Sequence, residues 1–279
     1  MKGIAAIIVL AILMPVLAMA GGAFDKQGFV TIRKDDHLWV FHSGSEELVE
    51  FKAKGELSRH TTRIGAGPAG LTLKAPDKET ILAYLAVKPG FVTRVSGERV
   101  WVFRDGCKEL EVVAAGGELA KHVTRVAAGP LDCTLEAPDN NTLDDYIAWK
   151  PGFVAHVVDG RLWVFHDGSE DLRTFESLGE LTQHVTRVGA GPGGMTIKGP
   201  DRGTIVDYVT ALDGFETFVN AENRLWVFRL GSQALEEFYE RGRPEKHITL
   251  VGAGPLGLTI KSSDHETAEA YIRACARWN

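Results

Sequence analysis

Histidines recur at a fixed spacing along the chain, and they are the residues best suited to chemistry. Successive members of the set lie 62, 62 and 63 residues apart, at His60, His122, His184 and His247. Neutral imidazole is a good ligand for copper, zinc and haem iron. If the segments that carry these histidines close around an axis, the four rings could form a metal site. The competing interpretation is a structural histidine that fixes one backbone junction in each segment.

A second pair of histidines alternates with arginines. His42 and His166 follow Trp-Val-Phe in the first and third segments, whereas Arg104 and Arg229 follow it in the second and fourth. In a ring, His42 and His166 would lie diagonally opposite and could form an alternative metal pair. Ordinary variation among surface residues explains the same alternation. No second ligand recurs at metal-binding spacing within a segment, so any metal site must draw ligands from several segments.

Threonine and lysine alternate on a short strand-like run in three of the segments. These residues are candidates for binding an anionic ligand: Thr72, Lys74, Thr196, Lys198, Thr259 and Lys261. The second segment has Glu136 in place of the lysine. The alternative is a solvated face of a strand.

All these candidates belong to four tandem repeats of about 62 residues, 28–89, 90–151, 152–213 and 214–279. Each repeat contains a Leu/Val-Trp-Val-Phe block, with its tryptophan at Trp39, Trp101, Trp163 or Trp226. A motif that recurs in every copy usually belongs to the scaffold. We therefore expect the tryptophans, and the tyrosines that recur with them, to lie in the core.

One repeat predicts the order ββαββα and an α+β fold. The first helix follows Ser45 and ends at Gly55, and Asp77 is a good N-cap for the second helix. The simplest arrangement is an antiparallel sheet with helices on one face. Apolar residues on both faces of the tryptophan strand, such as Leu38 and Trp39, indicate an inner strand that is covered on both sides.

The links between repeats are two residues long: Lys88-Pro89, Lys150-Pro151 and Leu212-Asp213. Flexible tethers are longer or rich in glycine and serine. A unit of this size is also marginally stable alone. We therefore expect closely packed repeats, either as a rigid stacked array or as a closed pseudo-fourfold ring.

The run Ile64-Gly65-Ala66-Gly67-Pro68-Ala69-Gly70 looks like the glycine fingerprint of dinucleotide-binding proteins. That site needs a helix after the glycines, so that helical N–H groups meet the pyrophosphate. Here a strand pattern follows and ends at Pro76. We expect a turn between two strands and no nucleotide.

The first 20 residues have the layout of a secretory signal peptide, with Lys2, an apolar run and Ala18-Met19-Ala20. We expect a periplasmic or secreted protein with no integral membrane segment after cleavage.

The net charge of −6 argues against nucleic acid as a partner. Cys107 and Cys133 lie in one repeat and could form a disulfide or remain free, and Cys275 is left over.

No catalytic constellation is evident, neither a Ser/His/Asp order nor paired carboxylates. We expect a non-enzymatic exported binding or structural module that engages a protein, an envelope polymer or a small ligand. One alternative is a periplasmic metal- or cofactor-binding protein that uses one histidine per repeat, and metal content would test it. Another is an enzyme with a site between repeats. A deep inter-repeat pocket lined by titratable groups with shifted pKa values would favour the enzyme.

Overall fold

The computed structural model describes residues 22–117 and 119–278. The signal-peptide assignment to residues 1–20 lies outside the described residues. Each repeat forms one four-stranded sheet with two α-helices and a 3₁₀ turn, so the α+β repeat fold expected from the sequence is confirmed. Among the described helices, none combines the length and apolar character needed to cross a bilayer.

The elements follow the same order in every repeat. The first repeat contains β1 (Phe29–Lys34), β2 (His37–His42), α1 (Glu46–Lys54), β3 (Thr61–Arg63), η1 (Pro68–Gly70), β4 (Thr72–Ala75) and α2 (Lys78–Ala86). The second contains β5 (Phe91–Ser96), β6 (Arg99–Arg104), α3 (Lys108–Ala114), β7 (Val123–Arg125), η2 (Pro130–Asp132), β8 (Thr134–Ala137) and α4 (Asn140–Ala148). The third contains β9 (Phe153–Val158), β10 (Arg161–His166), α5 (Glu170–Leu178), β11 (Val185–Arg187), η3 (Pro192–Gly194), β12 (Thr196–Gly199) and α6 (Arg202–Thr210). The fourth contains β13 (Phe215–Val219), β14 (Arg224–Arg229), α7 (Gln233–Arg241), β15 (Ile248–Leu250), η4 (Pro255–Gly257), β16 (Thr259–Ser262) and α8 (His265–Trp278).

The sheets are mixed, and the expectation of a simple antiparallel sheet is wrong. In the first repeat the strand order is β1-β2-β4-β3. The outer pairs β1–β2 and β3–β4 are antiparallel, but the central pair β2–β4 is parallel. The chain leaves β2 through α1, forms β3 at the far edge, and then turns back so that β4 fills the gap. The parallel central pair follows from this insertion.

Helices cover both faces of the sheet in the first, third and fourth repeats, so the expectation of helices on one face is also wrong. Leu38 and Val40 of β2 pack with Tyr84 of α2 in one cluster. Trp39 and Phe41 belong to a separate cluster that includes Leu48 and Phe51 of α1. The coverage of the tryptophan strand on both sides, read from its apolar pattern, is thereby confirmed.

Local sequence signals set the helix boundaries. The Ser45 side chain accepts a hydrogen bond from the amide of Leu48, and Gly55 ends α1 in the left-handed conformation with φ of 77°. The Asp77 carboxylate accepts a hydrogen bond of 2.7 Å from the amide of Thr80 and caps α2. These caps satisfy backbone groups that the first and last turns of a helix leave unpaired.

The second repeat lacks one of these caps. Cys107 occupies the position of Ser45 but makes no side-chain capping bond, and none of the residues of α3 is buried. All three cysteines are free thiols in the structure, so Cys107 and Cys133 are not bridged. The weak donor and acceptor character of a thiol explains the missing cap.

Neighbouring repeats share buried contacts. The hydroxyl of Tyr146 donates to the carbonyl of Ala86 at 2.9 Å, and Tyr208 donates to Ala148 at 2.6 Å. Tyr271 makes the same kind of bond to Thr210 at 2.8 Å. Each bond joins the second helix of one repeat to the end of the second helix before it. The repeats are therefore tied together rather than strung as independent units.

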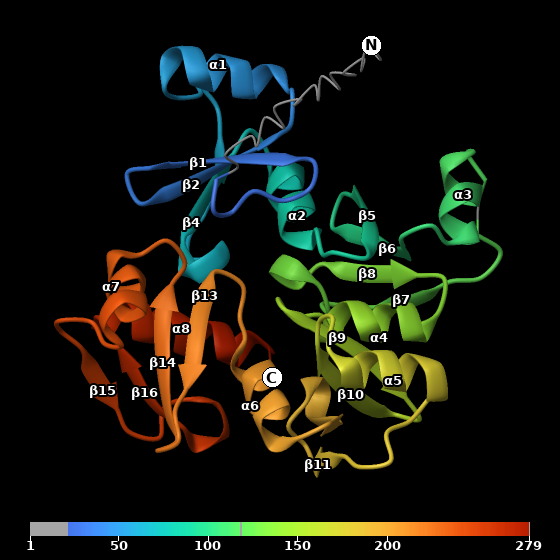
Figure 1. Ribbon diagram of the computed structural model, residues 1–279. Helices are drawn as coiled ribbons and strands as arrows, with labels where there is room; N and C mark the ends of the chain where they lie inside the picture. The colour runs from blue at the N-terminus through green and yellow to red at the C-terminus, as the bar shows by residue number, and fades with distance from the viewer. Residues whose placement is uncertain (1–21, 118, 279) are drawn as a thin grey trace, which may run out of the picture.

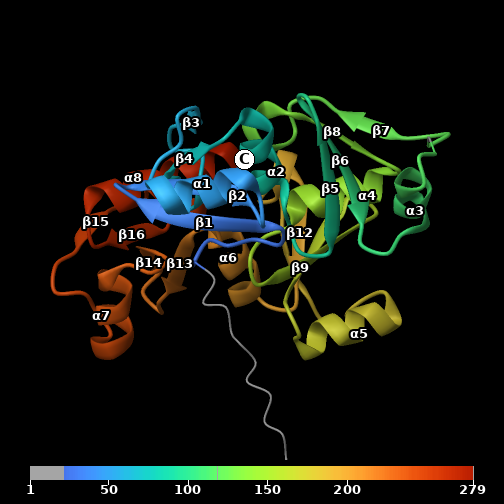
Figure 2. The ribbon, with the colours of Figure 1, turned by 90° about the horizontal axis from the view of Figure 1, so that it is seen from above.

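The fourth repeat also packs against the first, which closes the chain into a pseudo-fourfold ring (Figures 1 and 2). The turn η2 contacts α2 and η4 contacts α6, and in the same way η1 of the first repeat contacts α8 of the fourth. Ala69 of η1 is buried in the core cluster of the fourth repeat. Its amide donates to the carbonyl of Asp213 at 3.2 Å. Of the two arrangements left open by the sequence, the structure has the ring.

Candidate functional site

The links between repeats meet at a pocket of about 200 Å³, which we call the axial pocket. It is lined by residues that include Lys26, Val87, Lys88, Lys150, Leu212 and Asp213. Four of these residues hold the same position in successive repeats, two residues before the Gly-Phe that opens each: Lys26, Lys88, Lys150 and Leu212. Because equivalent residues of all four repeats line it, the pocket lies on the pseudo-fourfold axis.

The amine of Lys88 is fixed by the second repeat. Its Nζ donates to the carbonyl of Tyr146 at 2.7 Å and lies 4.1 Å from the centre of the Tyr146 ring. The Trp149 ring is 5.9 Å from the same atom. The side chain is half-buried. Lys88 therefore holds an amine against two aromatic faces at the wall of the pocket.

Lys150 repeats this arrangement one repeat later. Only 3% of the residue is exposed. Its Nζ donates to the carbonyl of Val209 at 3.0 Å and lies 5.1 Å from the centre of the Tyr208 ring. Burial of an amine disfavours its charged form.

Lys26 differs because it has a carboxylate partner. Its Nζ lies 3.0 Å from Oδ2 of Asp213, and the two side chains are 17% and 46% exposed. The same amine lies 4.8 Å from the centre of the Tyr84 ring. This ion pair joins the segment before the first repeat to the link before the fourth. Lys88 forms no ion pair with Asp213 in the described residues.

Burial governs the protonation of these groups. Desolvation lowers the pKa of Lys88 to about 7, an effect that the charge of Lys26 reinforces and that of Asp213 opposes. Burial likewise lowers the pKa of Lys150 to about 7. Burial raises the pKa of Tyr84, Tyr146, Tyr208 and Tyr271 well above the ordinary value. Near neutral pH the amines of Lys88 and Lys150 thus exchange protons readily, whereas the buried tyrosine phenols stay protonated.

We expect the free energy of unfolding to rise with pH from about 7 to about 9, where the thiols of Cys133 and Cys275 begin to ionise in the unfolded chain before the folded one, and to fall above 10. Between the lowered folded-state pKa of Lys88 and Lys150 and the ordinary lysine value, the unfolded chain binds protons that the folded protein does not. Each lysine then contributes a rise of up to about 1.4 kcal/mol per pH unit. Above pH 10 the tyrosines ionise only in the unfolded chain, and the sign reverses. Urea unfolding at a series of pH values measures the profile, and a flat profile between pH 7 and about 9 would contradict it.

The in-register histidines lie elsewhere. The rings of His60, His122, His184 and His247 lie 5.0, 5.1, 5.0 and 5.2 Å from the tryptophan ring of their own repeat. His42 lies against Phe29, and His166 lies against Phe153 and 3.4 Å from a carboxylate oxygen of Asp207. Within residues 22–117 and 119–278, no three His, Cys, Asp or Glu side chains gather as metal ligands. A metal site at these histidines stays a prediction that no ligand cluster in the described residues supports.

The strand-four lysines pack on the same tryptophans. The Nζ atoms of Lys74, Lys198 and Lys261 lie 5.3, 4.7 and 4.9 Å from the tryptophan ring centres. The neighbouring residues Thr72, Thr196 and Thr259 pair with the start of the tryptophan strand. In the second repeat Glu136 instead forms an ion pair of 2.7 Å with Arg99. These contacts account for the residues as parts of the scaffold, and an anionic-ligand patch here stays a prediction.

The glycine motif forms a turn between two strands, as expected. The turn η1 lies between β3 and β4 in the first repeat. Gly67 has φ of −83°, so it does not require the left-handed region. A larger residue is excluded sterically, because an added Cβ would lie 2.6 Å from Cδ2 of Leu73.

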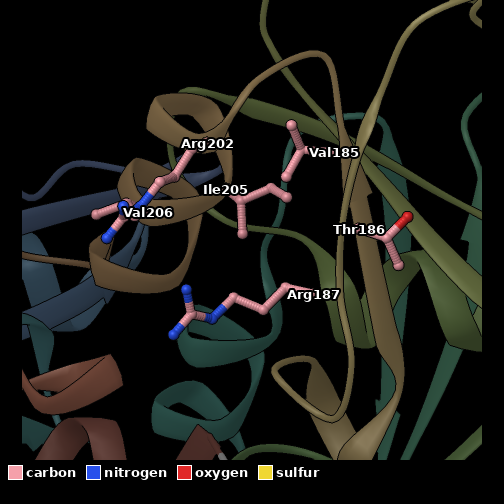
Figure 3. A pocket seen from close by; sticks show the side chains of 6 residues that line it. All are labelled: Val185, Thr186, Arg187, Arg202, Ile205 and Val206. Carbon is pink, nitrogen blue, oxygen red and sulfur yellow. The ribbon is translucent and has the colours of Figure 1, made fainter.

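A second cavity lies at the third repeat (Figure 3). It measures about 340 Å³ and is lined by Val185, Thr186, Arg187, Arg202, Ile205 and Val206. Arg187 extends from β11 toward α6, which carries Arg202. A neighbouring cavity of about 470 Å³ shares both arginines and reaches η4 of the fourth repeat. Among the described residues that line these two cavities, none is a lysine.

Comparisons with known proteins do not assign the chain: no protein-family model matches it, and searches of curated proteins and of solved structures give no significant match.

The three lysines of the axial pocket, which we call the axial lysines (Lys26, Lys88 and Lys150), could not be recognised from the sequence, in which Lys88-Pro89 and Lys150-Pro151 are only short links. The available signal was a lysine at the same position in three of four repeats. Its importance depends on ring closure, which brings the column together.

Proposed function

We propose that this chain is an exported binding protein that holds a small carboxylate or phosphate in the axial pocket. One observation carries the proposal: three of the four equivalent positions on the axis are lysine, and the fourth is Leu212. Leu212 indicates that an apolar residue suits this position in the fold. The lysines are costly to bury, so their presence is better explained by a ligand than by packing.

The charges at the pocket favour an anion. Asp213 pairs with Lys26, and Lys88 and Lys150 add two more amines at the wall. Bound anion would favour the protonated form of both amines and raise their pKa values again. By linkage, the protein then takes up protons when the anion binds. The strength of binding must therefore depend on pH near neutrality.

We expect inorganic phosphate and acetate to bind at pH 6.5 with measurable proton uptake, and to bind more weakly as the pH rises to 9. The decrease is up to about tenfold per pH unit for each proton taken up. Replacing Lys88 by leucine is expected to lower affinity by about tenfold, or ~1.4 kcal/mol. Isothermal titration calorimetry in buffers of different ionisation enthalpy measures both quantities.

The strand-four lysines supply the matched control. Replacing Lys74, Lys198 and Lys261 by leucine removes three cations that pack on tryptophans outside the axial pocket. We expect this triple variant to keep its anion affinity if it folds, which circular dichroism would check. Loss of binding in the triple variant with retention in Lys88→Leu would move the site to the sheet faces and reject the axial pocket.

The second candidate is an enzyme with its site between repeats. The observation that favours it is the lowered pKa of Lys88 and Lys150 at an inter-repeat pocket, because active sites are where such shifts cluster.

Export to the periplasm or the medium is part of the proposal and is supported by the signal-like layout of residues 1–20. Detection of the processed chain, starting near Gly21, in a periplasmic or culture fraction tests it.

A further inference from the structure

The three axial lysines offer three different amines. Lys26 is paired with Asp213 and therefore charged. Lys150 is 3% exposed and donates to the carbonyl of Val209. Lys88 is half-buried at the pocket wall, and among the described residues no carboxylate lies within salt-bridge distance of it. Lys88 thus combines contact with the pocket and freedom from an ion pair.

The surroundings of Lys88 favour a neutral, nucleophilic amine. Burial and the nearby charge of Lys26 lower its pKa to about 7, so about half of the molecules carry the free amine at that pH. The hydrogen bond to the carbonyl of Tyr146 uses one N–H and leaves the nitrogen lone pair available. A lysine that is desolvated and next to another cation is suited to attack a carbonyl group. The groups that face it are Lys26, Asp213, Tyr146, Trp149 and Lys150.

We propose that Lys88 captures a small 2-oxo acid covalently, as an imine formed inside the axial pocket. This inference rests on the proposed function of the pocket as an anion site. The carboxylate of the oxo acid would bind the ammonium of Lys26 while its carbonyl carbon meets Nζ of Lys88. The pocket volume of about 200 Å³ corresponds to roughly seven water molecules of about 30 Å³ each, which suits a compound of the size of pyruvate.

The reaction is balanced without a further reagent. The lone pair of the neutral Lys88 amine forms a C–N bond to the carbonyl carbon, and the carbonyl π electrons move to oxygen. A proton passes from nitrogen to this oxygen and gives a carbinolamine. Loss of the hydroxyl group together with the remaining nitrogen proton releases one water and forms the C=N bond. No electron donor or acceptor is consumed.

Reductive trapping tests the capture. The purified processed protein is incubated at pH 7.5 with pyruvate and sodium cyanoborohydride, which reduces an imine to a stable secondary amine. Intact mass spectrometry is expected to show one added carboxyethyl group, and peptide mapping is expected to place it on Lys88. Labelling of Lys88 is expected to be about a hundredfold faster than labelling of surface lysines, because far more of its amine is neutral at this pH.

Three variants sharpen the test. Lys88→Arg keeps a cation but removes the nucleophile and is expected to abolish the adduct, whereas Lys121→Arg, at an exposed position, is expected to leave it unchanged. Loss of the Lys26 charge raises the pKa of Lys88 and therefore slows trapping of any carbonyl compound. Lys26→Met is accordingly expected to slow trapping of pyruvate at least tenfold more than trapping of propanal, which has no carboxylate. Equal slowing of both compounds would reject the oxo acid as the ligand class.

The anion titration separates failure of this inference from failure of the binding function. Binding of phosphate and acetate without a preferential adduct at Lys88 would support the anion site and reject the imine. Absence of both anion binding and trapping would reject both proposals. An adduct spread evenly over surface lysines also overturns the imine at Lys88, because it requires no special amine.

Discussion

Replacing Lys150 by leucine is expected to raise the free energy of unfolding at pH 7 by about 1–4 kcal/mol. The amine is 3% exposed, and burial lowers its pKa to about 7, so the folded protein carries a cost that the unfolded chain does not. Leucine already occupies the equivalent position at Leu212. The lost hydrogen bond to the carbonyl of Val209 is a smaller effect, about 0.5–1.5 kcal/mol. Guanidinium unfolding followed by tryptophan fluorescence measures the difference.

The pH dependence of this gain identifies its cause. A lysine whose folded-state pKa is lowered costs most at and below pH 7, and the cost disappears as the pH approaches the ordinary lysine value near 10.4. The gain from Lys150→Leu must therefore shrink toward pH 10. The control is Lys121→Leu at an exposed position, where we expect a change within about 0.5 kcal/mol at any pH. A loss of stability in Lys150→Leu would mean that the hydrogen bond to the carbonyl of Val209 stabilises the fold by more than burial of the amine destabilises it.

A stabilising Lys150→Leu variant that no longer binds anions would be direct evidence of a trade between stability and function. Natural proteins retain such local costs mainly where a site needs them. Burial lowers the pKa of both Lys88 and Lys150, whereas Lys26 forms an ion pair with Asp213.

The sequence allowed much of each repeat to be predicted, because the signals are local. Ser45, Gly55 and Asp77 mark helix ends through caps that involve residues three or four positions away. The alternation of Leu38 and Trp39 correctly indicated a strand buried on both sides. The sheet order was not predictable in this way. Insertion of β4 beside β2 depends on a pairing between distant residues, and nothing in either strand excludes the antiparallel alternative.

The candidate site was harder to predict because no single repeat contains it. Lys88 and Lys150 each precede a proline in a polar link, which is the usual context of a solvated lysine. Only closure of the ring buries them around one axis. The histidines stood out in the sequence because they recur at the same position in every repeat. A structural contact between each histidine and the tryptophan of its own repeat, such as His60 with Trp39, explains the same regular spacing. Recurrence in all four copies is typical of scaffold residues, and the importance of the lysine column rests on its burial at the axis.

Replacing Gly214 by alanine is expected to lower the free energy of unfolding by about 2–4 kcal/mol, because it opens the ring. Gly214 has φ of 83°, and an added Cβ would overlap the amide nitrogen of Ala69 and lie 2.6 Å from the carbonyl carbon of Pro68. The turn η1 must then move away from the fourth repeat. That movement breaks the bond from the amide of Ala69 to the carbonyl of Asp213 and pulls Ala69 from a core in which it is 1% exposed. Urea unfolding measures the loss.

Gly152→Ala is the matched control, because it separates backbone strain from ring closure. Gly152 holds the same position in the third repeat with φ of 77°, but nothing lies within 4 Å of an added Cβ. We expect this variant to lose only about 1 kcal/mol, the cost of a non-glycine residue in the left-handed region. The two variants share the strain, so the excess loss in Gly214→Ala measures the contact between the first and fourth repeats. Equal losses would show that this contact contributes nothing to stability, and the axial lysines would then need another explanation for their burial.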